Sequence, residues 1–276
     1  MGERGLKVRQ ALAAAAARLA AASDTPRLDA ELLMAHALGV SRDDLLLRRL
    51  DGAEPPVFAA LVDRRLAHEP VAYITGIRAF WTIDIAVGPG ALVPRADSET
   101  LIEAAVDHFA GRAPATILDL GTGPGTLLLA ALDQWPQATG LGVDRSIEAL
   151  AMARANADRL GLGARARLVD GDWAAGIESR FDLILANPPY VGLDEALPPE
   201  VREHEPADAL FAGADGLDAY RAIVPDLPRL IAPGGVVILE IGHMQADAVA
   251  ALVEAAGLAP ALRRDLAGRP RAIIVT

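Results

Sequence analysis

The sequence predicts an α/β protein in which a mostly parallel sheet follows a small helical bundle. Three observations support this fold class. From about residue 113 onward, apolar runs alternate with segments long enough for crossover helices, which is typical of a parallel sheet covered on both faces. Roughly the first 75 residues show the spacing of apolar side chains that helices require. Between these regions the period changes to the alternation of a β-strand.

The N-terminal region, residues 1–75, is expected to be a domain of helices separated by stops. Ser23–Pro26 ends one helix and offers an N-cap and a proline for the next start. In the segment that follows, Leu28, Leu32, Ala35 and Leu38 share one helical face. The region carries no catalytic pattern, so it is either a folding cap or a docking surface for a large partner. The expected helices are Leu6–Ala22, Arg27–Leu38, Ser41–Arg49 and Pro56–His68.

Residues 76–96 are expected to form a β-hairpin that joins this domain to a larger one. Phe80–Val87 alternates in hydrophobicity and is rich in strand-forming residues. Gly88–Gly90 then turns the chain. A helix from about Asp97 to Ala110 opens the larger domain, which covers residues 97–276.

The larger domain contains the apolar runs that should form the sheet. Helical connections between most of them imply parallel neighbours. Sheets of this kind bind ligands at the carboxyl ends of their strands, near the point where the strand order reverses. The expected strands are Thr116–Leu120, Thr139–Val143, Arg167–Val169, Phe181–Ala186, Val236–Ile241 and Ala272–Thr276.

A glycine-rich turn follows the first of these strands. Its spacing is G-x-G-x-G, whereas a dinucleotide site needs G-x-G-x-x-G to seat a pyrophosphate. Asp119, two residues before the first glycine, would repel a diphosphate and would suit a ligand with a sulfonium or ammonium charge. Glycines permit positive φ and let the backbone approach a ligand closely. The candidate ligand-binding residues of the turn are Gly121, Thr122, Gly123, Pro124 and Gly125, and an apolar helix, Leu127–Leu132, follows.

Three more candidates follow the next two strands. Asp144 stands at the end of the second strand, where its oxygens could accept both hydroxyls of a ribose. Its structural alternative is to cap the helix Ser146–Ala157. Asp172 is placed to accept from an adenine amino group, and Trp173 offers a flat apolar wall. Core packing is the competing interpretation for Trp173, because large aromatic side chains are mostly buried.

The strand Phe181–Ala186 leads into Asn187-Pro188-Pro189-Tyr190 at the same edge of the sheet. An NH2 group on a planar carbon has two donors, and Asn187 and Pro188 can offer two acceptors, a side-chain oxygen and a backbone carbonyl. The prolines fix φ and remove competing N–H donors, and Pro188 also pushes Asn187 toward the extended region. Tyr190 can stack on the planar group. Asn187, Pro188, Pro189 and Tyr190 are therefore the candidate catalytic and substrate-binding residues, with an ordinary turn as the structural alternative.

The composition excludes several classes of function. The chain has 276 residues, 26 of them basic and 37 acidic, for a formal net charge of −11. No basic stripe is visible, so direct nucleic-acid binding is not expected. The acidic excess serves solubility or, alternatively, a basic partner. The absence of cysteine excludes disulfides, cysteine-ligated zinc and thiol catalysis, and the histidines show no ligand-like spacing, so no metal is expected.

Neither a membrane span nor a signal peptide is expected. The longest apolar run near the start, Ala11–Ala22, is rich in alanine and is interrupted by Arg18. We expect a monomer in the cytoplasm that does not contact the membrane.

The carboxylates and the glycine turn on successive strand ends resemble the class I S-adenosylmethionine-dependent methyltransferases. This resemblance implies a Rossmann-like seven-stranded sheet with a final antiparallel hairpin, for which Gly257–Leu262 and Arg271–Thr276 are the candidates. It implies S-adenosyl-L-methionine as methyl donor and S-adenosyl-L-homocysteine as product. Asn-Pro-Pro-Tyr resembles the motif of two groups within that class, the N6-adenine DNA methyltransferases and the protein-glutamine N5-methyltransferases.

Four further stretches resemble the PrmC/HemK family of peptide chain release factor glutamine methyltransferases, in register along nearly the whole chain. They are EPVAYITGIRAFW (Glu69–Trp81), LVPRADSETLIE (Leu92–Glu103), HEPADALFAGADGL (His204–Leu217) and LEIGHMQ (Leu239–Gln245). The resemblance implies methylation of the glutamine side-chain amide in the Gly-Gly-Gln motif of class 1 release factors, with the N-terminal domain as the docking region.

Three alternatives stay open. An enzyme that methylates a ribosomal-protein glutamine would share both sites. An N6-adenine enzyme would need a target-recognition domain and a basic surface. An S-adenosylmethionine-binding adaptor would tolerate a broken Asn-Pro-Pro-Tyr, which is intact here.

The resemblance assigns roles to individual residues, and the chain departs from the family pattern at two positions. It implies that Gly121–Gly125, Asp144, Trp173 and Asn187 bind S-adenosylmethionine and that Asn187–Tyr190 bind the glutamine. Ala96 stands where a second proline is expected, and His204 replaces an aromatic residue before Glu205-Pro206. Glu240 ends the fifth main strand and is followed by His243 and Gln245, and we interpret these three residues as N-capping or loop structure. Arg95 and Glu99 are interpreted as a helix-start ion pair or as lining of the substrate channel.

Overall fold

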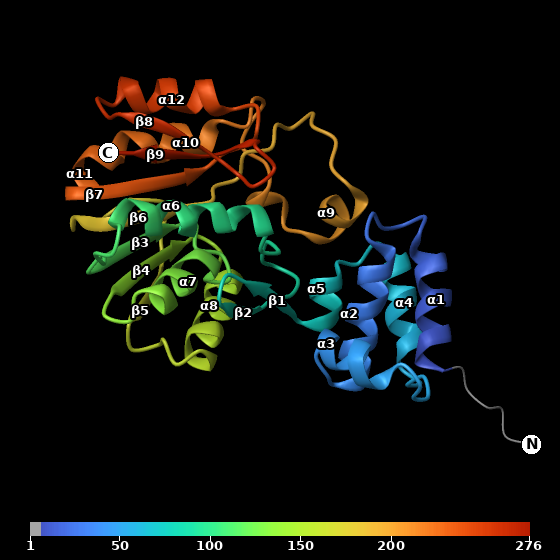
Figure 1. Ribbon diagram of the computed structural model, residues 1–276. Helices are drawn as coiled ribbons and strands as arrows, with labels where there is room; N and C mark the ends of the chain where they lie inside the picture. Colours follow the sequence, from blue (N-terminus) through green and yellow to red (C-terminus); the bar gives the residue numbers. More distant parts are fainter. Residues whose placement is uncertain (1–6) are drawn as a thin grey trace, which may run out of the picture. The chain divides into compact units, whose positions relative to one another are not determined.

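The computed structural model describes residues 7–276 and divides them into two compact units (Figure 1). Unit 1 contains the described residues up to Ile77 together with Leu197–His204. Unit 2 contains Arg78–Ala196 and Glu205–Thr276. The predicted boundaries place residues 197–204 in the larger domain, whereas their contacts group them with the helical unit.

Unit 1 is a set of helices around an apolar core. The proline at the start of α2 and the left-handed Gly39 after its end explain the limits of that helix. The expected helix Ser41–Arg49 is instead a short α-helical turn followed by a π-helical one, and Leu6, the predicted start of the first helix, lies outside the described residues. The elements are α1 (Val8–Leu19), α2 (Pro26–Leu38), α3 (Arg42–Asp44), η1 (Leu45–Arg49), α4 (Phe58–Leu66), α5 (Val71–Thr75) and α9 (Pro199–His204).

A buried guanidinium joins α2, α4 and α9 within unit 1. Arg65 is 5% exposed and donates to Asp29 at 2.7 Å, and it lies 2.6 Å from Glu200. His204, which departs from the family pattern, makes a polar contact here: its ring nitrogen Nε2 lies 3.2 Å from the carbonyl oxygen of Ala67. These contacts explain why residues 197–204 belong to the helical unit.

The hairpin that follows has its turn inside the run that the sequence predicts to be one strand. Its strands are β1 (Ile77–Phe80) and β2 (Ile83–Ala86), so the prediction of a continuous strand over Phe80–Val87 was wrong. Trp81 adopts a left-handed φ of 54° in the turn. Its backbone N–H donates to Glu99, and its indole N–H donates to Gln134, which compensates a conformation that is uncommon for a residue other than glycine.

Unit 2 contains a seven-stranded sheet with the order β5-β4-β3-β6-β7-β9-β8. Strands β3 to β7 pair in parallel, whereas β9 is antiparallel to β7 and to β8, so the predicted fold class with its final antiparallel hairpin is confirmed. The strands are β3 (Thr116–Leu120), β4 (Thr139–Asp144), β5 (Ala166–Asp170), β6 (Phe181–Ala186), β7 (Ile231–Glu240), β8 (Pro260–Arg264) and β9 (Pro270–Val275).

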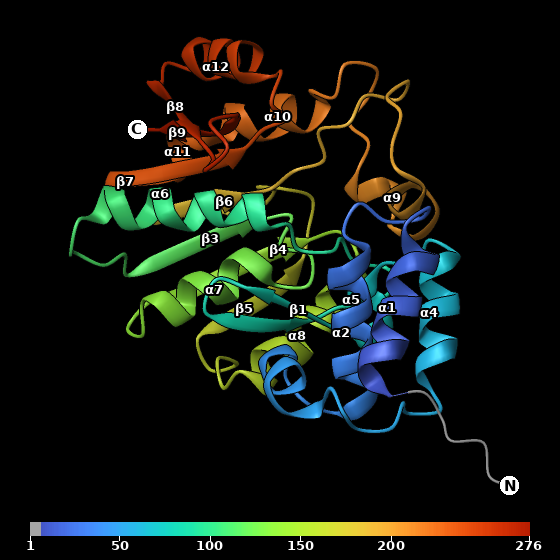
Figure 2. The ribbon, with the colours of Figure 1, turned by 45° about the vertical axis from the view of Figure 1, so that its right-hand side comes forward.

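Helices cover both faces of this sheet (Figures 1 and 2). Alternate residues of β3, Leu118 and Leu120, share an apolar cluster with Tyr220, Leu227 and Val249 of the helices on one face. That face is covered by α10 (Asp218–Ile223), η4 (Val224–Asp226), α11 (Leu227–Leu230) and α12 (Ala246–Ala255). The other face is covered by α6 (Glu99–Phe109), which follows η2 (Ala96–Ser98), and by α7 (Thr126–Gln134) and α8 (Ile147–Arg159).

Residues 7–276 contain neither a candidate membrane span nor a candidate metal site. None of the helices there combines the length and the apolar character that crossing a membrane requires. The same residues contain no group of three or more histidine, aspartate or glutamate side chains arranged to hold a metal ion.

Candidate active site

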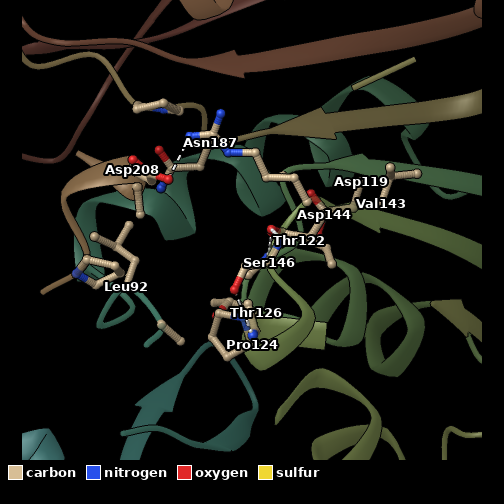
Figure 3. A pocket seen from close by; sticks show the side chains of 18 of the residues that line it. Leu92, Asp119, Thr122, Pro124, Thr126, Val143, Asp144, Ser146, Asn187 and Asp208 are labelled. Carbon is tan, nitrogen blue, oxygen red and sulfur yellow. Dashed lines mark hydrogen bonds and ion pairs between the residues drawn. The ribbon is translucent and has the colours of Figure 1, made fainter. Parts of the chain in front are cut away.

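A cavity of about 990 Å³ opens at the carboxyl ends of β3, β4 and β6, and its lining residues all belong to unit 2. Figure 3 shows Asn187 and Asp208 on one side of it and Thr122, Asp144 and Ser146 on the other. Three of the predicted site residues, Gly125, Pro188 and Tyr190, are not part of the lining. The predicted residues that line the cavity are Asp119, Gly121, Thr122, Gly123, Pro124, Asp144, Asp172, Trp173, Asn187 and Pro189.

The glycine-rich turn is held close to the cavity by short contacts. Gly121 has a φ of 73°, and a Cβ at that position would lie 3.1 Å from the Trp173 ring, so only glycine leaves this wall of the cavity in place. Gly125 has a φ of 89° and forms the N-terminal cap of α7, where a Cβ would lie 2.8 Å from Leu129. Gly125 therefore shapes the helix start behind the cavity.

Asp119 is the most buried carboxylate of the site, with an exposure of 1%. Its Oδ2 accepts from the Thr122 hydroxyl at 2.7 Å and from the Leu128 backbone N–H at 3.2 Å. Its Oδ1 has no hydrogen-bond partner among residues 7–276. Burial raises the pKa of Asp119 to about 7, and the negative charge of Asp144 acts in the same direction. A cationic ligand beside it would favour the ionised form.

Asp144 connects the glycine turn to the start of α8. Its Oδ2 accepts from the Gly123 backbone N–H at 2.7 Å, and its Oδ1 accepts from the Ser146 backbone N–H at 2.8 Å. The N-cap of α8 is Ser146, whose hydroxyl accepts from Ala149, so the capping alternative for Asp144 was wrong. Each Asp144 oxygen keeps a second lone pair with which it can accept a ligand hydroxyl.

Asp172 and Trp173 lie next to each other on the cavity wall. Asp172 is exposed, and Trp173 is half-buried with a left-handed φ of 48°. The Trp173 ring also packs against the apolar cluster of the sheet, so it makes core contacts and lines the cavity at the same time. Its contact with a ligand stays a prediction.

Asn187 reaches the cavity from the end of β6. Its Nδ2 donates to the Ser98 hydroxyl oxygen at 3.2 Å, which directs the amide and leaves Oδ1 as its acceptor. Among residues 7–276, no hydrogen bond occupies Asn187 Oδ1 or the backbone carbonyl of Pro188. Two adjacent residues therefore present two free acceptors at this edge of the sheet.

Tyr190 and the loop after β7 are tied together by Gln245. The Gln245 side-chain N–H groups donate to the carbonyl oxygens of Tyr190 at 2.9 Å and Gly216 at 3.2 Å, and its Oε1 accepts from the Gly242 N–H at 3.0 Å. Burial raises the pKa of Tyr190 to about 12, which keeps the phenol neutral. Gln245 stands at the N-cap position of α12, one of the two interpretations offered for it, and its side chain holds the end of the Asn-Pro-Pro-Tyr segment in place.

Glu205 joins two stretches that are far apart in the sequence, LVPRADSE and HEPADAL. This carboxylate is 6% exposed, pairs with Arg95, and accepts from the Val93 backbone N–H at 3.1 Å. Glu99 accepts from Trp81, so the ion pair predicted between Arg95 and Glu99 was wrong. The LVPRADSE and HEPADAL stretches thus share an ionic contact whose carboxylate is buried and whose guanidinium is partly exposed. Ser98, which lines the cavity, and Glu205, which supports it from behind the lining, were not identified from the sequence.

Comparisons with known proteins agree with this architecture. Two family models match the chain: PrmC N-terminal domain over residues 10–76 and methyltransferase small domain over residues 97–198. A methyltransferase from Pyrococcus furiosus has a TM-score of 0.53 at 19% identity and covers 77% of this chain and 95% of that one. The T. thermophilus 16S rRNA N2 G1207 methyltransferase, solved with AdoMet and guanosine, has a TM-score of 0.52 at 20% identity, covering 72% of this chain and 49% of that one. Both likenesses show the fold.

Sequence relatives are more specific. The release factor glutamine methyltransferase of Rhodospirillum rubrum is 45% identical over 257 residues, which cover 91% of this chain and 79% of the relative. That of Cereibacter sphaeroides is 46% identical over 276 residues and covers 97% of this chain and 98% of the relative. These matches extend over both units, and the chain belongs to the release factor glutamine methyltransferase family.

Proposed function

We propose that this protein transfers a methyl group from S-adenosyl-L-methionine to the side-chain amide nitrogen (N5) of the glutamine in the Gly-Gly-Gln motif of class 1 peptide chain release factors. Relatives named release factor glutamine methyltransferase, similar along nearly the whole chain, support the substrate. The observation that carries the chemistry is the free acceptor Asn187 Oδ1 on a residue that lines a cavity suited to a cation, followed directly in the chain by the free carbonyl of Pro188.

The residues present fit S-adenosylmethionine. The cavity volume is at the upper end of the usual range for small-molecule sites. Among the described lining residues, several are carboxylates and Arg145 is the basic one. This excess of negative charge favours a positively charged ligand and disfavours a polyanion. Asp119 adds a buried oxygen without a partner. The lining carboxylates are Asp119, Asp144, Glu148, Asp172, Asp208 and Asp218.

Within this cavity each group has a role that its position supports. Asp144 accepts the ribose hydroxyls, Asp172 the adenine amino group, and Trp173 covers an apolar face. Asp119 holds the glycine turn through Thr122 and α7, and it contributes negative charge. When bound, S-adenosylmethionine supplies a methyl group on a positively charged sulfur.

The Asn-Pro-Pro-Tyr segment orients the substrate amide. Asn187 Oδ1 and the Pro188 carbonyl accept its two N–H groups, so the nitrogen lone pair is directed away from them. Both hydrogen bonds strengthen as positive charge develops on the nitrogen during transfer, because they hold the protons that carry that charge. The nitrogen gains the methyl group as the donor's S–C bond breaks, and it then loses one of its two protons, so that the product amide is neutral. Pro188 and Pro189 have no N–H that could compete, and Tyr190 stacks on the amide plane.

We propose that the N-terminal domain, residues 1–75, docks the release factor, that the enzyme acts as a cytoplasmic monomer, and that it does not bind nucleic acid directly. The net charge of −11 and the acidic lining of the cavity support a protein substrate over DNA or RNA.

The test is transfer of labelled methyl from S-adenosylmethionine to purified unmethylated release factor, with ribosomal proteins and DNA in parallel. We expect label on the Gly-Gly-Gln glutamine, lost in Asn187→Ala and retained in the exposed control Gln137→Ala. Label on a ribosomal protein or on DNA alone would overturn the substrate. No label on any of them, with S-adenosylmethionine bound, would favour a binding adaptor.

A further inference from the structure

Glu240 is a buried carboxylate that the proposed chemistry does not yet use. It is the last residue of β7 and is 1% exposed. The Tyr220 hydroxyl donates to its backbone carbonyl at 2.7 Å, which fixes the strand end. Its side-chain Oε2 has no hydrogen-bond partner within residues 7–276. Burying a carboxylate with a free oxygen is costly, so its presence calls for an explanation.

The charges around Glu240 come from several elements. Burial raises its pKa to about 7, and a hydrogen bond from the Ser98 side chain opposes that rise. Arg271 of β9 and Arg95, which precedes η2, also lower the pKa, whereas Asp97 of η2 raises it. The other titratable groups that face it are the phenols of Tyr190 and Tyr220, whose pKa values are raised by burial first and by the charge of Glu240 second.

Ser98 connects Glu240 to the candidate active site. It is 2% exposed and lies at the end of η2. Its hydroxyl oxygen accepts from Asn187 Nδ2 at 3.2 Å, so its hydroxyl hydrogen remains free to donate elsewhere. Asn187 and Glu240 follow the paired residues Ala186 of β6 and Leu239 of β7, which places Glu240 on the same side of Ser98's surroundings as Asn187, and the Ser98 side chain acts on the Glu240 carboxylate. This arrangement allows one directional chain, in which Asn187 donates to Ser98 and Ser98 can donate to Glu240.

We propose that Glu240 is a positioning residue for methyl transfer, which acts through Ser98 to orient and polarise the side-chain amide of Asn187. This inference rests on the proposed function. A carboxylate that accepts from Ser98 makes the serine oxygen a better acceptor for Asn187 Nδ2. Electron density in the Asn187 amide then shifts toward Oδ1, because hydrogen bonds in a chain polarise one another. Oδ1 becomes the stronger acceptor that the glutamine amide needs.

The proposal predicts a dependence on the charge of Glu240. The chain is strongest when the carboxylate is ionised, so kcat should rise as pH increases through the region around 7. Asp119 titrates in the same region. Saturating S-adenosylmethionine removes the contribution of Asp119 to cofactor binding, and kcat then reports on Glu240.

The experiment measures kcat, KM for the release factor and the pH profile from 5.5 to 8.5 for wild type, Glu240→Gln, Ser98→Ala and the double variant. Glutamine keeps the size of the side chain and removes the charge. The matched control is Glu254→Gln on the exposed surface of α12. S-adenosylmethionine affinity and the melting temperature of every variant verify the fold.

We expect Glu240→Gln to lower kcat by about tenfold or more with KM nearly unchanged, and to remove the acidic limb of the profile. Ser98→Ala should give a similar loss, and the double variant no further loss, because both residues belong to one chain. A folded Glu240→Gln enzyme with the kcat and pH profile of wild type overturns this inference, as does an additive double variant. If wild type itself does not methylate the release factor, the proposed function fails instead.

Discussion

Replacing Gly216 with alanine tests how firmly the Asn-Pro-Pro-Tyr segment must be held. Gly216 is buried with a φ of 71°, and a Cβ there would lie 2.2 Å from the Tyr190 carbonyl oxygen and 2.7 Å from Gln245 Nε2. Gly234 offers a matched control, since its φ is 76°, it is exposed, and a Cβ would meet nothing within 4 Å. Both variants share the cost of a left-handed alanine, about 1–2 kcal/mol.

The contact with Tyr190 adds a second cost in Gly216→Ala alone. The carbonyl must move by about 1 Å, which weakens the two Gln245 hydrogen bonds to Tyr190 and Gly216, each with a net contribution of about 0.5–1.5 kcal/mol. We therefore expect Gly216→Ala to lose about 1–3 kcal/mol more stability than Gly234→Ala. A shift of about 1 Å next to the substrate should also lower kcat about a hundredfold.

Urea unfolding followed by tryptophan fluorescence measures this difference. The three tryptophans, Trp81, Trp135 and Trp173, all lie in unit 2, so the signal reports on the unit that contains Gly216. Methyl transfer to the release factor gives kcat. Equal unfolding free energies for the two alanine variants, together with an unchanged kcat for Gly216→Ala, would refute the proposed role of the Gln245 contacts.

Three further predictions concern the cofactor pocket and unit 1. Asp144→Asn should weaken S-adenosylmethionine binding about tenfold to a hundredfold in calorimetry, because an amide cannot accept from both backbone N–H groups; the exposed Asp247→Asn should not. S-adenosylmethionine should bind more tightly as pH rises from 6 to 8, as Asp119 loses its proton, and Asp119→Asn should flatten this dependence in the same titrations. Without ligand the raised pKa of Asp119 has the opposite effect: its stabilising contribution is present below the unfolded value of 3.8 and is lost by about pH 7. Arg65→Ala should destabilise unit 1 by about 3–5 kcal/mol in amide exchange of α2, because the buried Asp29 then keeps only hydroxyl donors, from Ser23 and Thr25, and no cationic partner. Arg64→Ala breaks an exposed pair with Glu69 and should cost less than about 1 kcal/mol.

The strands that carry the pocket could be predicted from the sequence because their signals are local. Buried apolar runs ending in Gly121 and Asn187 give the limits of β3 and β6 as the structure has them. The start of β7 was missed, because Pro233-Gly234-Gly235 predicts a turn, although the strand continues back to Ile231 and pairs with Phe181. Trp81 was missed as a turn residue since nothing in its neighbourhood signals a positive φ.

The site was predictable in its residue types and not in its supporting contacts. Asp144 and Asn187 stand at strand ends, and a parallel sheet brings such ends together. Asn187 contacts Ser98, which is 89 residues away in the sequence, and Ser98 leads to Glu240, which is 53 residues from Asn187. Residue spacing in the sequence does not predict contacts over such separations. The same holds for Gln245, which reaches Tyr190 across 55 positions.

Because residues 197–204 belong to unit 1, that unit cannot finish folding until they have been synthesised. Ribosomes synthesise about 5–20 residues per second, and N-terminal domains usually fold first. Here the helices up to Ile77 are complete long before α9 is synthesised, so the helical unit waits on the order of 6–25 s for its last segment. During that interval Arg65 has Asp29 but not Glu200 as a partner. The nascent chain therefore exposes an unfinished surface that is closed only after the strand leading to Asn187 has been synthesised.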